Sequence, residues 1–128
     1  MRYILDTHTV IWYFGNSLKL PNNLRDLIDN SENTVYISSA SLWEIAIKTS
    51  LEKLKLSSSF DDLLNTVNDY DYNILQIKHE YLRIYYNLPL LHRDPFDRLL
   101  ISTAISENLT LITKDENIQK YDVPWIWN

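Results

Sequence analysis

The pattern of apolar and polar positions divides the chain into short apolar runs separated by amphipathic segments. Four runs have the length and the β-branched or aromatic content of strands, and a fifth, PWIW, begins with the proline typical of an edge strand. The predicted strands cover residues 3–5, 34–37, 73–77, 109–113 and 124–127. Because helical segments separate them, the pattern predicts an α/β sandwich with a mainly parallel central sheet flanked by helices.

Helical spacing of apolar residues predicts the segments between the strands. The predicted helices cover residues 7–14, 21–30, 40–51, 60–68 and 78–86, with a last one after HRDPF. In residues 40–51, the side expected to be buried carries Trp43, Ile47 and Leu51. In the last helix, the buried side is expected to be Leu100, Ile101, Ala104 and Ile105.

Length and composition favour one compact domain over residues 1–128, because a chain that is 45% hydrophobic at this size can bury a substantial core. The absence of cysteine excludes disulfides, thiolate zinc sites and cysteine nucleophiles, and agrees with a cytoplasmic protein. No apolar run approaches the ~20 residues of a membrane span, so we expect no membrane partner.

The net charge is −5 and the pI about 5.0. Such a balance counts against general nucleic-acid binding, which needs clustered lysine and arginine, but it leaves room for a local basic rim. It also fits a cluster of carboxylates that receives a cation or a basic partner protein.

Four acidic residues are expected to meet at one edge of the sheet. In an open parallel sheet, ligands bind outside the carboxyl ends of the strands. Asp6 follows the first strand, Glu44 lies just beyond one helical turn after the second, and Asp115 follows LTLIT. The helix that begins at DPFDR leads into LTLIT, so its N-terminus and Asp97 return to the same edge.

Each acid also has a structural interpretation, and taken singly the sequence leaves both open. Asp6 and Asp115 can cap the helices that follow them, and Glu44 can complete a capping box with the serine three residues earlier. Asp97 can be an ordinary first-turn acid. Asp94, before the proline of HRDPF, is interpreted as the N-cap of its helix.

The convergence of these acids favours a metal site. Two carboxylates ~4 Å apart at an effective dielectric constant of ~20 repel by roughly 4 kcal/mol, so such a group needs protons, arginines or a metal. Carboxylates without a histidine pair suit Mg²⁺, or Mn²⁺ in its place. A site of this kind is suited to phosphoryl chemistry with a metal-activated water.

Four stretches of the chain resemble the PIN-domain ribonucleases and, within them, the VapC-type toxins of type II toxin–antitoxin pairs. They are ILDTHTVIW, ISSASLWEIAIK, HRDPFDRLLISTA and LTLITKDENI, which together extend over nearly the whole chain. The family pattern of four acids falls on Asp6, Glu44, Asp97 and Asp115 without departure. The resemblance implies a PIN-like three-layer sandwich and a Mg²⁺-dependent endoribonuclease. It also implies an RNA substrate, a homodimer, and a cognate antitoxin that covers the catalytic groove in a hetero-oligomer.

Within this resemblance, Asp6 and Asp97 are expected to be direct metal ligands, with Glu44 and Asp115 acting through water or orienting the nucleophile. Residues expected to contact phosphate or a carboxylate are Thr7, Thr113, Lys48, Arg93, Arg98 and Lys114; for the four basic side chains a solvated charged face is an equal alternative. His8 and His92 receive no role. Trp12 and Phe14 are expected to supply a dimer or antitoxin surface.

Two other functions remain as alternatives. A haloacid-dehalogenase-like phosphatase would need an acid two residues after Asp6, where this chain has His8. A non-catalytic acidic α/β binding module would keep all its activities when Asp6 is replaced by asparagine.

Overall fold

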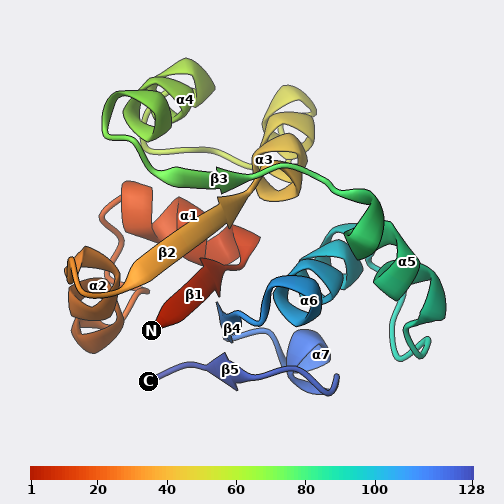
Figure 1. The fold of residues 1–128 in the computed structure, drawn as a ribbon. Coiled ribbons are helices and arrows are strands. Elements are labelled where there is room, and N and C mark those ends of the chain that lie inside the picture. Colours follow the sequence, from red (N-terminus) through yellow and green to blue (C-terminus); the bar gives the residue numbers. More distant parts are fainter.

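The computed structural model describes residues 1–128 and contains five strands and seven helices (Figure 1). The strands are β1 (Arg2–Leu5), β2 (Thr34–Ser38), β3 (Asn73–Leu75), β4 (Thr110–Ile112) and β5 (Trp125–Ile126). The helices are α1 (Thr7–Phe14), α2 (Asn22–Asp29), α3 (Ser39–Ser50), α4 (Phe60–Asp69), α5 (His79–Asn87), α6 (Pro95–Glu107) and α7 (Glu116–Gln119). Every predicted element is present, and the predicted ends of β3 and β4 extend one or two residues too far.

The five strands form one sheet in the order β3-β2-β1-β4-β5, and every pair is parallel. The central strand β1 pairs Tyr3 with Val35 on one side and with Thr110 on the other. The prediction of a mainly parallel sheet is confirmed, and PWIW is indeed an edge strand. Parallel neighbours require helical crossovers, which is why helices separate the strands in sequence.

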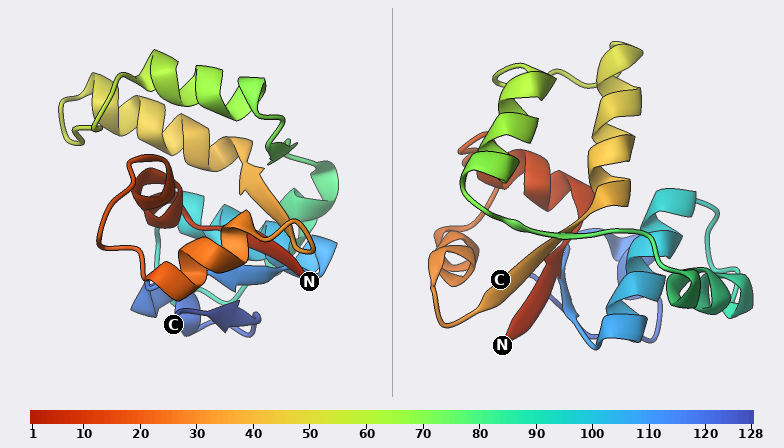
Figure 2. Two further views of the ribbon diagram at one scale, coloured as in Figure 1. Left: turned by 90° about the vertical axis from the view of Figure 1, so that its left-hand side faces the viewer. Right: turned by 45° about the horizontal axis from the view of Figure 1, so that its top comes forward.

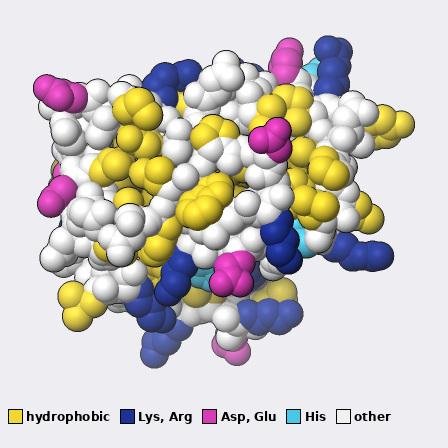
Figure 3. Space-filling view, turned by 90° about the horizontal axis from the view of Figure 1, so that it is seen from below, with side chains coloured by type: hydrophobic (Ala, Val, Ile, Leu, Met, Phe, Trp, Pro, Cys, Tyr) yellow, Lys and Arg dark blue, Asp and Glu magenta, His cyan; other side chains and the backbone are white.

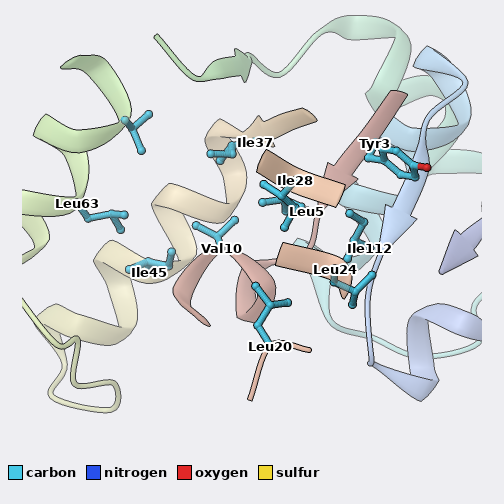
Figure 4. Close-up of a cluster of buried hydrophobic side chains, with 11 residues drawn as sticks. Tyr3, Leu5, Val10, Leu20, Leu24, Ile28, Ile37, Ile45, Leu63 and Ile112 are labelled. Carbon is cyan, nitrogen blue, oxygen red and sulfur yellow. The ribbon is translucent and has the colours of Figure 1, made fainter. Parts of the chain in front are cut away.

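Helices cover both faces of the sheet, which gives the three-layer sandwich that the resemblance implies (Figures 1 and 2). Alternation along β1 sends Leu5 to a core shared with α1–α4, drawn in Figure 4, and Ile4 to a core shared with α6 and α7. Both residues are almost completely buried. The left view of Figure 2 shows α4 lying along α3, where Leu63 and Ile45 belong to the same cluster.

The buried side of α3 differs from the prediction. Trp43 and Leu51 are 57% and 58% exposed, whereas the buried residues are Ala40, Ser41, Glu44 and Ile45. The ring of Trp43 instead packs edge-on against Phe96 of α6, with the ring centroids 5.2 Å apart. The side of α3 that enters the protein is therefore partly polar, and it carries one of the predicted site acids.

No helix of this fold is long and apolar enough to cross a membrane. On the face drawn in Figure 3, lysine and arginine side chains lie among acidic and hydrophobic ones and do not merge into one basic surface. This mixed surface agrees with the acidic net charge of the chain.

Candidate metal centre

The carboxyl ends of the parallel strands place the predicted acids at one edge of the sheet. In Figure 1 the arrowheads of β1 and β2 point to the edge at which α1 and α3 begin. Asp6 follows β1 directly, and Glu44 lies on the second turn of α3. The helix α6 runs back from this edge and turns into β4 through Asn108, which adopts a left-handed conformation (φ 56°) that ends the helix.

Asp6 uses its two carboxylate oxygens for two different purposes. Oδ1 accepts a hydrogen bond from the backbone N–H of Thr9 (2.8 Å), which caps α1, and Oδ2 accepts one from the hydroxyl of Thr113. The side chain is buried, and this burial raises the pKa of Asp6 despite the hydrogen bonds that lower it. The helix cap that the sequence suggested is therefore real, but it occupies only one oxygen.

Glu44 is a buried carboxylate held by two donors. The Thr7 hydroxyl donates to Oε1 at 2.7 Å, and the Lys48 ammonium, one turn further along α3, donates to Oε2 at 2.7 Å. The pKa of Lys48 is raised, first by this hydrogen bond and also by the nearby charges of Asp94 and Asp97. Because α3 begins at Ser39 with Ser38 as its N-cap, Glu44 lies too far inside the helix to complete a capping box.

Asp94 and Asp97 divide the two roles that the DPFD sequence allows. Asp94 is the N-cap of α6 and accepts from the backbone N–H of Asp97 at 3.0 Å, with Pro95 as the first helical residue. The Asp97 side chain does not cap the helix, and it is only 16% exposed. Burial, together with the charges of Asp94, Asp115 and Glu44, raises the pKa of Asp97 to about 7.

Asp115 caps the short helix α7 by accepting from the backbone N–H of Asn117 at 2.8 Å. Its own backbone N–H donates to the hydroxyl of Thr113, which in turn donates to Asp6. The negative charge of Asp115 also contributes to the raised pKa of Asp97. Asp115 is thus connected to Asp6 through Thr113 and lies close enough to Asp97 for their charges to interact.

The structure gives the predicted phosphate-binding residues more specific partners. Thr7, Thr113 and Lys48 all direct hydrogen bonds to site carboxylates. Arg98 does not join them: it is 6% exposed, and its guanidinium donates to the carbonyl of Pro89 and the hydroxyl of Tyr121, both at 2.9 Å.

The expected phosphate contact of Arg98 is not supported by this position. One residue along a helix turns the side chain by about 100°, so the neighbour of a site acid points into the protein. The other two basic candidates, Arg93 and Lys114, are exposed next to their acids.

His92 is a site residue that the sequence analysis missed. Its Nε2 lies 3.1 Å from Oδ2 of Asp97, and its Nδ1 lies 2.9 Å from the hydroxyl of Tyr121. The only sequence signal was its position five residues before Asp97, because Tyr121 lies 29 residues further along the chain.

Two hollows lie on the surface. The larger, of about 300 Å³, is formed by the end of α1, the segment after α3, and α4, and both Trp12 and Phe14 line it. The smaller, of about 190 Å³, is almost entirely apolar and lies between α3, α5 and α6, where Trp43 and Phe96 are part of its wall. The expectation that Trp12 and Phe14 contribute to a partner surface remains a prediction.

The donor set at the edge fits a hard divalent cation. It consists of carboxylates and hydroxyls, and no three acidic or histidine side chains converge into a ready-formed metal cage. Mg²⁺ usually keeps several waters and binds through one or two carboxylates, so it does not need such a cage. Burial first, and then the charges of Asp94, Asp115 and Glu44, raise the pKa of Asp97, so a bound cation would stabilise its ionised form.

Comparison with known proteins gives a consistent classification. The family model described as PIN domain matches residues 3–124. A search of curated protein sequences finds no match.

Solved structures with the same fold span the whole chain. VapBC2 from Rickettsia felis, bound to a DNA fragment from its promoter, has a chain with 26% identity and a TM-score of 0.71, and the match covers 100% of both chains. DNA-bound VapBC from Salmonella typhimurium has 19% identity and a TM-score of 0.72, covering 98% of this chain and 97% of the other. VapBC-5 from Mycobacterium tuberculosis, a member of the VapBC family of toxin–antitoxin systems, has 18% identity and a TM-score of 0.65, covering 99% and 98%. With the family model matching nearly its full length, this chain belongs to the PIN domain family.

Proposed function

We propose that this protein is a Mg²⁺-dependent endoribonuclease that acts as the toxin of a type II toxin–antitoxin pair. The observation that carries the proposal is the Asp97 carboxylate, which is only 16% exposed in the first turn of α6. Burial, together with the charges of Asp94, Asp115 and Glu44, raises its pKa to about 7. These carboxylates would hold a divalent cation, which would offset their repulsion and supply the Lewis acid that phosphodiester cleavage needs. Membership of the PIN domain family, which supports a nuclease, favours the same activity.

We assign Asp6 and Asp97 as the direct ligands of Mg²⁺, with Mn²⁺ as a substitute, and Glu44 and Asp115 as acids that act through water. When bound, the cation supplies a Lewis acid and a more acidic water for attack on phosphorus. The chain contributes the orientation of the carboxylates. The Thr113 hydroxyl fixes Oδ2 of Asp6, while Thr7 and Lys48 fix the two oxygens of Glu44.

Lys48 also supplies positive charge at the rim of this site. Its side chain is 42% exposed, and an ammonium group has three donors, of which Glu44 uses one. We propose that a remaining donor meets a phosphate of the RNA. Because Lys48, Arg93 and Lys114 are few basic side chains on an acidic protein, RNA binding is expected to be moderate and to weaken as salt increases.

A protein partner is part of the proposal. The structural neighbours include DNA-bound VapBC proteins, and VapBC-5 is a member of the VapBC family of toxin–antitoxin systems. Exposed apolar patches often mark protein–protein surfaces. This chain has two surface hollows: a mixed one that Trp12 and Phe14 line together with polar side chains, and an almost entirely apolar one that contains Trp43 and Phe96. We propose that a cognate antitoxin and a second copy of this chain cover such surfaces.

The nuclease is tested with purified protein and a labelled RNA in the presence of Mg²⁺ or Mn²⁺. We expect cleavage that EDTA abolishes and added Mg²⁺ restores, and we expect Asp6→Asn and Asp97→Asn to be inactive. Asp69→Asn is the matched control, because Asp69 is an exposed acid at the end of α4 and away from the sheet edge. Cleavage by Asp6→Asn at the wild-type rate would overturn the metal assignment.

The toxin role is tested separately by inducing the wild-type chain and Asp6→Asn in bacteria. We expect growth arrest only with the wild-type protein, and we expect relief when its cognate antitoxin is co-expressed. Growth arrest by both forms would contradict a catalytic toxin.

A further inference from the structure

The segment that follows α7 reaches back to the loop before α6. Tyr121 is 4% exposed, and its hydroxyl oxygen meets three nitrogen atoms. It accepts from the backbone N–H of His92 at 3.2 Å and from Nη1 of Arg98 at 2.9 Å, and it lies 2.9 Å from Nδ1 of His92. A single phenol group therefore holds both the backbone and the ring of His92.

These three contacts determine where the ring proton of His92 lies. A phenol oxygen accepts at most two hydrogen bonds and donates one. The backbone N–H of His92 and the guanidinium of Arg98 can only donate, so they use both acceptor positions. The Tyr121 hydroxyl must then donate its proton to Nδ1 of His92, which makes Nδ1 an acceptor.

A neutral imidazole carries its proton on one nitrogen only. With Nδ1 accepting, that proton is on Nε2, which lies 3.1 Å from Oδ2 of Asp97. We propose that His92 is a positioning residue for Asp97, held by Tyr121 and Arg98 in the tautomer whose Nε2–H donates to that carboxylate. A chain of donors thus runs from Arg98 through Tyr121 and His92 to Asp97.

The surroundings of the network keep it in this one arrangement. Arg98 is anchored by the carbonyls of Leu88 and Pro89, and its guanidinium stacks over the ring of Tyr85 with a distance of 5.1 Å to the centroid. The His92 side chain is 12% exposed and packs edge-on against Tyr121. The donor in contact with Asp97 is therefore fixed in direction before any ligand arrives.

The tautomer follows from the hydrogen bonds alone, whereas the effect on metal binding rests on the proposed function. Partners that orient a ligand typically change metal affinity or activity 10–100-fold when they are lost. We expect His92 to act on the affinity for the cation, by holding Oδ2 and leaving the other oxygen of Asp97 free to bind it.

The first experiment is ¹⁵N NMR of the imidazole rings in metal-free protein, with His92→Gln used to assign the signals among the three histidines. We expect His92 of the wild type to have a protonated Nε2 and an unprotonated Nδ1, and Tyr121→Phe to lose this preference. A protonated Nδ1 in the wild type would overturn the network, whatever the activity of the protein.

The second experiment compares Mn²⁺ binding by calorimetry in His92→Gln and His92→Asn. The longer glutamine side chain can place an N–H near the position of Nε2, whereas asparagine reaches only the position of Nδ1. We expect about a tenfold or larger loss of Mn²⁺ affinity in His92→Asn and a loss of less than about threefold in His92→Gln. His79→Gln is the control, because His79 is exposed at the start of α5.

Equal losses in the two His92 variants, or none, would overturn the positioning role. If the wild-type protein neither binds Mn²⁺ nor cleaves RNA, the proposed function fails together with the effect on metal. The NMR result then still decides whether Arg98 and Tyr121 fix the tautomer of His92.

Discussion

Replacing Asp97 by asparagine is expected to stabilise the metal-free protein while abolishing nuclease activity. The substitution keeps the size of the side chain and one oxygen that can accept from Nε2 of His92. The cap of α6 is unaffected, because Asp94 bonds to the backbone N–H of residue 97 and not to its side chain. What the substitution removes is a buried negative charge beside three other acids.

The magnitude follows from the pKa of Asp97. A rise from the ordinary value of 3.8 to about 7 is equivalent to an upper limit of about 4 kcal/mol of destabilisation when the group is fully ionised. An acid in the first turn of a helix is itself worth about 0.3–1 kcal/mol, and the variant loses that contribution. With relaxation of the site, we expect a net gain of about 1–3 kcal/mol in the free energy of unfolding at pH 8.5.

The pH dependence has a defined sign. Between about pH 4 and pH 7 the folded state holds a proton on Asp97 that the unfolded state has lost, so the wild-type free energy of unfolding falls as pH rises. The loss is half complete at the folded-state pKa of about 7 and complete about one pH unit above it. The advantage of Asp97→Asn is therefore small near pH 4.5, grows through neutrality and is full at pH 8.5.

Urea unfolding in EDTA at pH 4.5 and 8.5 measures this difference, with Asp69→Asn as the exposed control. For a domain of this size, a gain of 1–3 kcal/mol moves the urea midpoint by about 1 M. Saturating Mg²⁺ should then raise the stability of the wild type and leave Asp97→Asn nearly unchanged, because only the wild type retains both direct ligands, Asp6 and Asp97. A variant that is no more stable than the wild type at pH 8.5, or equally shifted at both pH values, would refute the reasoning.

Two further substitutions separate structural from site roles. Asp94→Ala should lower the free energy of unfolding by about 1 kcal/mol, because α6 loses its cap, and it should still cleave RNA. Urea unfolding measures the first effect and a cleavage assay the second. Loss of cleavage without loss of stability would show that the roles of Asp94 and Asp97 are reversed. Thr113→Val should lower the free energy of unfolding by about 1–3 kcal/mol and reduce the cleavage of RNA, because it removes the hydroxyl that donates to Asp6 and accepts from the backbone N–H of Asp115. The control Thr103→Val, at a buried hydroxyl that bonds only within α6, should remain active, and an equal loss of activity in both would show that Thr113 has no special role.

The order of elements and the sheet edge could be predicted because they depend on local pattern and on one topological rule. Runs such as YIL and LTLI are short, apolar and bounded by polar residues, and in parallel sheets each must be followed by a helix. Asp6 comes directly after β1 and Asp115 comes three residues after the end of β4, and these positions fix the edge at which both acids lie.

The buried side of α3 could not be predicted from hydrophobicity, because the site reverses the usual pattern. Glu44 faces inward to meet Thr7, although Trp43 beside it is one of the largest apolar side chains. A buried polar group is tolerated only where partners satisfy it, and its two partners lie in different parts of the sequence. Conflicts between local pattern and fold of this kind are expected at functional sites.

Asp97 and Arg98 illustrate why the remaining contacts escaped the sequence analysis. Adjacent charged residues on a helix look like one cluster in the sequence, but the helical turn sends Asp97 to the sheet edge and Arg98 into the protein. Arg98 still serves the same carboxylate, through Tyr121 and His92, because the segment after α7 folds back onto the loop before α6. Asp115 caps the start of α7, and Tyr121 follows the end of this short helix. One short stretch therefore supplies both a site acid, Asp115, and the tyrosine that orients a second site acid, Asp97, through His92.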